Sequence, residues 1–322
     1  MSRLIDVHRH LWGIDWFPPS HLGRAMVENA RRSNRTLEQV RERYMQSPTM
    51  ETTGAGAIQE MEHYKIDVSI IIALDWGLAY GPEEDNELPV DVWHKMTSEA
   101  CERYPGKLYW MAGVDPRRPK CVALLEQSVK EWGAMGWKVY PPNGYQANAD
   151  FCMPMYKKCA ELDIPVLIHV DSRNTWTMPE WVGDVARRVP DLRIIMGHTN
   201  LQSPFETGNY WRGLITGGAR NIWLDIGDWQ ALGAVADENI PQLMKVIRVF
   251  LDSKGPERIC WGTDLPQAGL GGKARGQCER WSEIFLNLPE WGAKYGVTFT
   301  EEERDGICYK ATEALCSNVF KK

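Results

Sequence analysis

The chain has 322 residues, of which 43% are hydrophobic and 25% charged, as is ordinary for a soluble globular protein. Its formal net charge is -6 and it has no long basic stretch, which argues against nucleic acid as a partner. No apolar window reaches the roughly 18 residues of a membrane helix, and Asp6, His8 and His10 interrupt the N-terminal apolar run that a secretory signal needs. The eight cysteines form no CxxC pair, so we expect them to be reduced, buried side chains of a cytoplasmic protein.

Apolar runs rich in β-branched residues alternate along the chain with amphipathic stretches. The runs predict β-strands at residues 3–8, 67–74, 108–114, 136–140, 165–170, 192–197, 222–226 and 258–262. The amphipathic stretches predict helices at residues 52–65, 89–104, 119–133, 151–162, 178–189, 207–218, 238–253, 275–287 and 301–317. Asp150 and Thr300 stand where helix N-caps are expected.

This alternation indicates an α/β fold with a parallel sheet and crossover helices. Eight repeats favour closure into a (β/α)8 barrel of the TIM type, and the chain has no Gly-rich phosphate loop that would favour an open nucleotide-binding sheet. No linker or repeat divides the sequence, so residues 1–322 are predicted to form a single domain. The segment 11–51 departs from the pattern, and we expect it to be a partly helical insertion over the barrel mouth.

The first predicted strand ends in the sequence DVHRH, which places His8 and His10 two residues apart. Side chains alternate along a strand, so both imidazoles point to the same side, toward the barrel axis. Two buried imidazoles are poor core residues without polar partners, whereas neutral imidazoles are common metal ligands. An HxH sequence also arises by chance, so this pair alone does not distinguish a metal site from a core.

Further residues that carry chemistry fall where other predicted strands end. His169 and His198 lie at the ends of the fifth and sixth strands, and Asp264 follows the eighth. Each histidine alone is compatible with a satisfied core residue, but barrels place catalytic groups at these strand ends. Three nitrogens and one carboxylate suit one divalent transition metal, zinc foremost, with iron, manganese and cobalt also tolerated. The remaining histidines have no such placement and are expected on the surface: His21, His63 and His94.

The segments DVHRH, LIHVD, IMGHT and WGTDLP, in this order and spacing, resemble the amidohydrolase superfamily. The resemblance spans residues 3–266 and is greatest to the amidohydrolase-related branch that includes aminocarboxymuconate semialdehyde decarboxylase and the resorcylate-type decarboxylases. It implies a distorted (β/α)8 barrel with one catalytic metal held by His8, His10, His169 and Asp264. It also implies that His198 lies beside the metal-bound water or the substrate rather than among the ligands.

The resemblance leaves two reactions open. In hydrolysis the metal activates a water, Asp264 accepts its proton as the catalytic base, and His198 polarises the attacked centre. In non-oxidative decarboxylation the same residues act on an aromatic or related unsaturated carboxylic acid, whose ring carbon is protonated before carbon dioxide leaves. The segment TNLQSPFE after His198 departs from the acidic and aromatic pattern of the decarboxylases, which favours hydrolysis.

Three residues near the strand ends are expected to contact a small, flat substrate. Trp12 and Trp176 offer aromatic surface, and Arg173 in LIHVDSRNTW offers a fork of donors to a carboxylate or nitro group. The alternative for Arg173 is a surface ion pair with Asp171 or Glu180. For each tryptophan near the motifs, the alternatives are a pocket wall and ordinary core packing; the others are Trp16, Trp229 and Trp261.

Lys138, in GWKVYPP on the fourth predicted strand, is expected to be a charge partner inside the barrel or a substrate contact. Carboxylation of Lys138 to bridge two metals is disfavoured, because the branch that the sequence resembles is mononuclear. The complete ligand set argues against a non-catalytic binding or scaffold protein. Members of the branch are often homo-oligomers, so a homodimer is expected by analogy.

Overall fold

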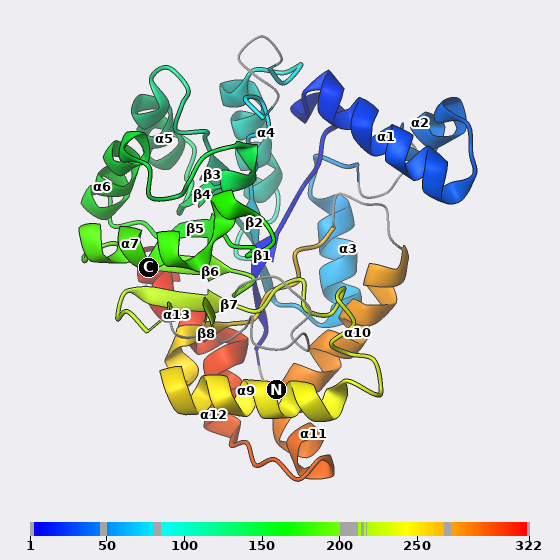
Figure 1. The fold of residues 1–322 in the computed structure, drawn as a ribbon, viewed down its shortest axis with the longest axis vertical. Helices are drawn as coiled ribbons and strands as arrows, with labels where there is room; N and C mark the ends of the chain where they lie inside the picture. Colours follow the sequence, from blue (N-terminus) through cyan, green and yellow to red (C-terminus); the bar gives the residue numbers. More distant parts are fainter. Residues whose placement is uncertain are drawn as a thin grey trace.

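The structure, a computed structural model, describes residues 3–45, 50–79, 85–199, 212–213, 216, 218–266 and 272–320. Eight parallel strands neighbour one another in sequence order, which confirms the predicted (β/α)8 barrel (Figure 1). The strands are β1 (Ile5–Arg9), β2 (Val68–Ile72), β3 (Leu108–Gly113), β4 (Trp137–Val139), β5 (Val166–His169), β6 (Ile194–Gly197), β7 (Ile222–Asp225) and β8 (Ile259–Cys260).

The barrel closes between its last and first strands. β8 is only two residues long, shorter than the expected 258–262, but the chain beyond it continues the pairing with β1. Val7 N donates to Trp261 O at 3.1 Å, and His10 N donates to Leu265 O at 2.6 Å. Between these two bonds lies Asp264, which is therefore held against the C-terminal end of β1.

Helices surround the sheet and cover its outer face (Figure 1). Those that follow the strands are α3 (Ala55–Tyr64), α4 (Val90–Glu102), α5 (Cys121–Lys130), α6 (Met153–Glu161), α7 (Pro179–Arg188), α9 (Ile240–Lys254) and α10 (Gly272–Leu286). The C-terminal part contains α11 (Leu288–Lys294), α12 (Glu301–Asp305), α13 (Ala311–Leu315) and α14 (Ser317–Phe320). The helix expected at 207–218 lies mostly outside the described residues. Across the described part of the chain, no helix is long and apolar enough to span a bilayer.

One of the two predicted N-caps is present. The Thr300 hydroxyl accepts a hydrogen bond from Glu303 N at 3.1 Å, and the Glu303 carboxylate accepts one from Thr300 N at 2.9 Å, which forms a capping box at the start of α12. The prediction for Asp150 is wrong, because it begins a short 3-10 turn and α6 starts only at Met153. Pro154 occupies the first turn of α6, where a missing N–H is tolerated.

The apolar interior has two layers. Inside the barrel, Val7, Ile70 and Leu167 pack in one cluster with Ala311 and Leu315 of α13. A larger cluster fills the space between the sheet and the helices, and it contains three of the tryptophans that flank the motifs: Trp16, Trp229 and Trp261. For these three, ordinary core packing is the interpretation that the structure supports.

His94 lies in the core, so its predicted surface position is wrong. It is fully buried on α4, with its ring 4.4 Å from the Trp93 ring and 5.4 Å from the Trp110 ring, centroid to centroid. Its two ring nitrogens lie 3.1 Å from Ser128 Oγ and 2.9 Å from Gly113 O. These partners make burial of the imidazole tolerable, and they come from elements far from His94 in the sequence. His63 is exposed as predicted, with 62% of its side-chain surface accessible, and the side chain of His21 is outside the description.

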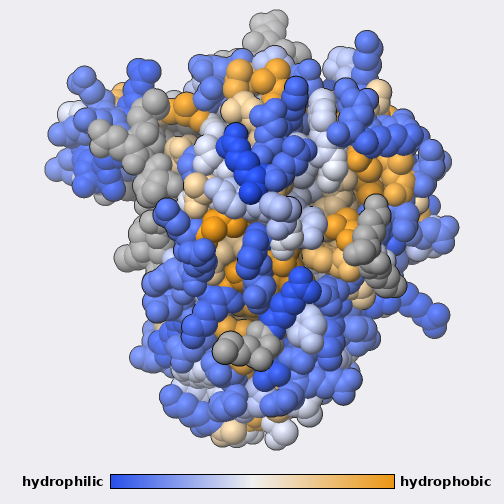
Figure 2. Space-filling view, turned by 180° about the vertical axis from the view of Figure 1, so that it is seen from behind, coloured by the Kyte–Doolittle hydropathy of each residue, from blue (hydrophilic) through white to orange (hydrophobic). Residues whose placement is uncertain are grey.

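The segment 11–51 combines a short part against the barrel with a helical part set apart from it. After the turn Ile14–Trp16, the helices α1 (Pro19–Ser33) and α2 (Leu37–Met45) stand beside the ring of helices (Figure 1). Seen from behind, the molecular surface is largely hydrophilic, with apolar side chains in scattered patches (Figure 2).

Candidate metal centre and its surroundings

β1 delivers two imidazoles to one point inside the barrel. His8 and His10 are both buried, and their ring centroids lie 5.2 Å apart. The Nδ1 atom of His8 lies 2.7 Å from a carboxylate oxygen of Asp225, and the Nδ1 atom of His10 lies 2.6 Å from Ile72 O. An oxygen acceptor lies beside Nδ1 of each ring, so the tautomer that fits has its proton on Nδ1. In this tautomer the lone pair of each Nε2 atom is available to a metal. This is the arrangement that orients metal-binding histidines in proteins.

Asp264 completes a group of three ligand atoms. Its Oδ1 lies 2.9 Å from His10 Nε2 and 3.2 Å from His8 Nε2, and one ligand atom of each residue falls within 4.8 Å of the others. Asp264 has a left-handed backbone, with φ 58°, a conformation that non-glycine residues adopt rarely and mainly at functional sites. Its N–H donates to His8 O at 2.7 Å, which fixes the carboxylate in front of the imidazoles.

The charge states in this group suit a cation. Burial lowers the pKa of His8 well below its ordinary value, and burial also lowers that of His10, so both rings are neutral at neutral pH. Burial raises the pKa of Asp264, but positive charge at His8 and a hydrogen bond with His10 outweigh burial and favour a pKa below its usual range; with both rings neutral, a bound cation would supply that positive charge. Neutral imidazoles beside an ionised carboxylate form a donor set of the kind that binds zinc and related ions.

His198 and His169 extend the group on its other side. The ring of His198 stacks on that of His8 with centroids 4.7 Å apart, and its Nδ1 lies 3.1 Å from Gly227 O. His198 Nε2 lies 3.2 Å from His169 Nδ1. The four histidines at strand ends thus form a chain of contacts. His169, however, is not within 4.8 Å of all members of the group formed by His8, His10 and Asp264, so its role as a ligand stays a prediction.

Asp225, at the end of β7, lies beneath the histidines, and the sequence analysis did not identify it as a site residue. It is fully buried, and besides its contact with His8 it accepts hydrogen bonds from His198 N at 3.1 Å and Gly227 N at 2.7 Å. Gly262 explains part of this packing, because an added Cβ there would lie 2.7 Å from the Asp225 carboxylate. The signal available in the sequence was an acid at the end of a strand, in NIWLD, which we did not single out.

Lys138 of β4 is buried beside the same histidine. Its Nζ lies 3.2 Å from His8 Nε2. Burial lowers the pKa of Lys138 to about 8, although Asp264 and Asp225 favour the charged form. This position agrees with the expectation that Lys138 is a charge partner inside the barrel. A contact between Lys138 and the substrate stays a prediction.

An aromatic cluster borders the histidines on the side of segment 11–51. Trp12 stacks on His10 with ring centroids 4.6 Å apart, and Phe17 packs next to Trp12. The cluster also includes Leu74, and Met50, Trp76 and Tyr140 pack against it. Tyr140 in turn lies 5.0 Å from His169, centroid to centroid. The rings of Trp12 and Tyr140 therefore lie next to His10 and His169, and because Trp12 is only 4% exposed, its contact with a substrate stays a prediction.

The other predicted substrate contacts lie farther out. Arg173 is paired with Asp171, with Nη2 2.8 Å from the carboxylate and 56% of its side chain exposed. This is the surface ion pair that the sequence offered as the alternative. Trp176 is 42% exposed, and its ring contacts no other aromatic ring within the described part of the chain. Binding of substrate by Arg173 and Trp176 therefore stays a prediction.

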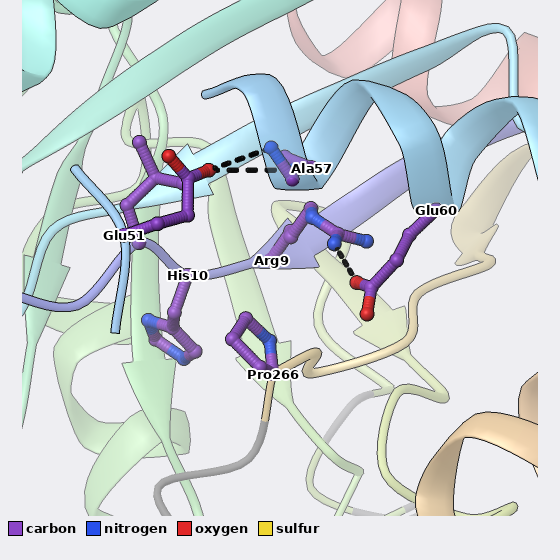
Figure 3. A pocket seen from close by; sticks show the side chains of 8 residues that line it. Arg9, His10, Glu51, Ala57, Glu60 and Pro266 are labelled. Carbon is purple, nitrogen blue, oxygen red and sulfur yellow. Dashed lines mark hydrogen bonds and ion pairs between the residues drawn. The ribbon is translucent and has the colours of Figure 1, made fainter. Parts of the chain in front are cut away.

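Behind His8 and His10, Arg9 leaves β1 on the outer side. Figure 3 shows Arg9 and Glu60 of α3 turned toward each other, with His10 on the other side of the strand and Glu51 turned to Ala57 at the start of α3. Glu51 also accepts from Gly56 N at 3.1 Å. The Arg9–Glu60 pair fastens β1 to α3, and Glu51 accepts hydrogen bonds at the start of α3.

A family model described as amidohydrolase matches residues 5–315 of the chain. No curated protein matches it. Similar solved structures include a probable 2-pyrone-4,6-dicarboxylic acid hydrolase from Acinetobacter baumannii (15% identity, TM-score 0.64) and 5-carboxyvanillate decarboxylase from Sphingomonas paucimobilis (12%, 0.66). A third is 2,6-dihydroxybenzoate decarboxylase in complex with 2,6-dihydroxybenzoate (15%, 0.62). The alignments cover 98% of this chain and 99%, 99% and 100% of those chains, and at these identities they establish the fold alone.

Proposed function

Since the chain belongs to the amidohydrolase family, we propose that it is a metal-dependent hydrolase acting on a small cyclic or aromatic molecule. The observation that carries the proposal is the group of His8, His10 and Asp264, whose ligand atoms lie within 4.8 Å of one another. Each imidazole is anchored through Nδ1, and Asp264 is the most open member, with 19% of its side chain accessible.

The residues fit one divalent transition metal, for which we propose zinc. His8 and His10 would hold it through Nε2, Asp264 through its carboxylate, and His169 as the fourth ligand. The ion supplies a Lewis acid and lowers the pKa of a coordinated water to about 7. His8 Nε2, His10 Nε2 and the Asp264 carboxylate are acceptors that lie within 4.8 Å of one another, and acceptors so close together in a buried site favour a cation between them.

The side chains divide the remaining work of hydrolysis. Asp264 accepts the proton of the attacking water and returns it to the leaving group, because its carboxylate is ionised and faces the barrel mouth. His198 faces the same space from β6 and stabilises negative charge on the attacked group. Trp12 and Tyr140 flank the histidines and would hold a flat ring against them.

Decarboxylation is the alternative, and the two reactions share these residues. Among the similar structures two are decarboxylases and two are described as a probable or putative hydrolase, so the likeness does not favour either reaction. The segment TNLQSPFE after His198 departs from the acidic and aromatic pattern expected of the decarboxylases, which is our reason for proposing hydrolysis.

Asp264→Asn tests the proposal. The amide keeps the shape and one ligand oxygen but cannot accept the proton, so activity should fall by about 100-fold or more while metal content falls less. The measurement is turnover of a panel of cyclic amides, lactones and aromatic acids, with ring absorbance and released carbon dioxide followed together. Release of carbon dioxide would establish decarboxylation, and full activity of the variant would remove Asp264 from the mechanism.

A further inference from the structure

Three loops at the mouth of the barrel meet at Asp75, which follows β2 and is 3% exposed. Its carboxylate accepts hydrogen bonds from Gly77 N at 3.0 Å, in its own loop, and from Asp115 N at 2.8 Å, in the loop after β3. Its backbone oxygen accepts from Asn143 Nδ2, in the loop after β4, at 2.7 Å. These bonds join the loops that follow β2, β3 and β4.

Arg118, also in the loop after β3, holds two acids of the loop after β2 with one guanidinium group. Its Nε and Nη2 donate to the Asp75 carboxylate at 2.5 and 2.8 Å, and its Nη1 donates to Asp85 at 2.6 Å. Asp75 lies at the start of the loop and Asp85 near its end, so Arg118 fastens the loop at two points. A lysine could not make both contacts in this way, because its single ammonium group lacks the planar fork.

The two contacts of Arg118 differ in their exposure to solvent. The side chains of Arg118 and Asp75 are 12% and 2% exposed, whereas that of Asp85 is 48% exposed. Hydrogen bonds from Arg118 lower the pKa of Asp85 more than its partial burial raises it, so this carboxylate is ionised at neutral pH. Solvent weakens an exposed ion pair, so the contact with Asp75 is expected to be the stronger of the two.

The loops joined in this way carry two aromatic rings of the cluster beside the histidines. Trp76 stands between Asp75 and Gly77, and its ring meets that of Tyr140 edge to face with centroids 4.6 Å apart. Tyr140, in the loop after β4, lies 5.0 Å from His169, centroid to centroid. A Cβ added at Gly77 would collide with the guanidinium group of Arg118, which shows how closely the chain beside Trp76 packs on it.

We propose that Arg118 is a positioning residue, which holds Trp76 and Tyr140 as a preformed wall for a flat ring beside His169. This inference rests on the proposed function, in which such a ring enters the mouth. A wall that is ordered before the substrate arrives reduces the conformational entropy that binding would otherwise cost. Arg118 touches neither the proposed metal ligands nor the proposed base, so it acts on substrate binding through the two loops.

Arg118→Lys in the zinc-loaded, full-length protein tests the inference, and Arg248→Lys is the matched control. Arg248 also holds two acids with one guanidinium group, since its Nη2 lies 2.8 Å from Asp252 and 2.7 Å from Glu303. These contacts lie within α9 and between α9 and α12, away from the three loops. The measurements are amide hydrogen–deuterium exchange, zinc content, and steady-state kinetics with the best substrate of the panel of cyclic amides, lactones and aromatic acids.

In Arg118→Lys, amide exchange should become about tenfold faster at Gly77 and at Gly144, one in each of the loops that carry the rings. Gly144 is the sharper reporter, because Arg118 reaches its loop only through Asp75 and Asn143. KM should rise about tenfold, with kcat and zinc content unchanged, because the wall contributes to binding and not to the chemical step.

Asp85→Asn should cause the same changes to a smaller extent, because the buried contact between Arg118 and Asp75 remains. This variant keeps the inference testable if Arg118→Lys does not fold. Arg248→Lys should leave exchange at Gly77 and Gly144, and KM, as in the wild type.

The outcomes separate a positioning role from a general effect on stability. Exchange that rises equally in the barrel strands, unchanged exchange at Gly144, or a fall in kcat with KM unchanged would overturn the inference. If the wild type turns over no substrate of the panel, the proposed function fails on its own. Faster exchange confined to the loops that carry Trp76 and Tyr140 would then still support the role of Arg118, and unchanged exchange would overturn it.

Discussion

Asp225 is expected to set the metal affinity of the site through His8, and Asp225→Asn is the perturbation that tests it. One oxygen of Asp225 accepts hydrogen bonds from His8 Nδ1 at 2.7 Å and from His198 N at 3.1 Å, and the other accepts from Gly227 N at 2.7 Å. An asparagine offers one oxygen and one NH2 group in their place. Either orientation of the amide therefore turns a donor toward a buried donor.

The size of the effect follows from the two orientations. If the amide oxygen faces His8, the ring keeps its tautomer, loses a charged partner and leaves Gly227 N–H unpaired. If the NH2 group faces His8, Nδ1 must accept and the ring proton moves to Nε2, the atom that faces Asp264. Both changes weaken the ligand, and loss of such a partner lowers metal affinity by about 10- to 100-fold. That range corresponds to about 1.4 to 2.8 kcal/mol of binding free energy.

The assay is competition for zinc between the purified protein and a chromophoric chelator. Asp6→Asn is the matched control, because Asp6 is equally buried and accepts from Thr263 N at 2.9 Å, Thr263 Oγ1 at 2.6 Å and the backbone N–H of His8 at 3.1 Å, but none of its hydrogen bonds comes from an imidazole ring. Asp6→Asn should lower the free energy of unfolding and leave zinc affinity within a few-fold of the wild type. An unchanged affinity in Asp225→Asn, or an equal loss in both variants, would refute the reasoning.

Three further predictions concern other residues. His169→Ala should lose most of its zinc in metal analysis, whereas His198→Ala should retain zinc and lose turnover; the reverse result would exchange their roles. Burial lowers the pKa of His94 to about 3, below the value of about 6.5 in the unfolded chain. The neutral ring therefore stabilises the fold above pH 6.5, and this stabilisation is lost as the pH falls toward 3. Between pH 7 and 4.5 the free energy of unfolding should fall by about 2.5 kcal/mol through His94 alone. Denaturant unfolding should show that His94→Gln lacks this fall, whereas the exposed control His63→Gln keeps it. Trp12→Ala should raise KM for ring substrates by about tenfold with zinc content unchanged, because it removes the surface stacked on His10; an unchanged KM would remove Trp12 from the binding site.

The parts of the fold that sequence predicted are those with local signals. Alternation of apolar runs and amphipathic stretches predicted all eight strands, since each pattern lies within a few neighbouring residues. The HxH spacing placed His8 and His10 on the same side of β1 for the same reason. The parallel order of the strands then brought His198 and Asp264 to the same end of the barrel.

Long-range partners account for what sequence did not predict. Asp225 is 217 residues from His8, and nothing near either residue indicates that they share a hydrogen bond. His94 is a polar residue on a helix, so its sequence favours a position on the surface. Its burial is explained only by Ser128 and Gly113, which provide hydrogen-bond partners for its ring nitrogens. The need for a partner is visible in the residue type, but the partner itself is fixed only when the barrel closes.

Arg173 illustrates how the same reasoning bears on specificity. Its sequence allowed two interpretations, a contact with an anionic substrate and an ion pair with Asp171, and the structure has the ion pair, two residues away along the loop. A local pair of this kind forms at little entropic cost because the loop already holds both groups close together. An arginine so neutralised repels no substrate and attracts none strongly.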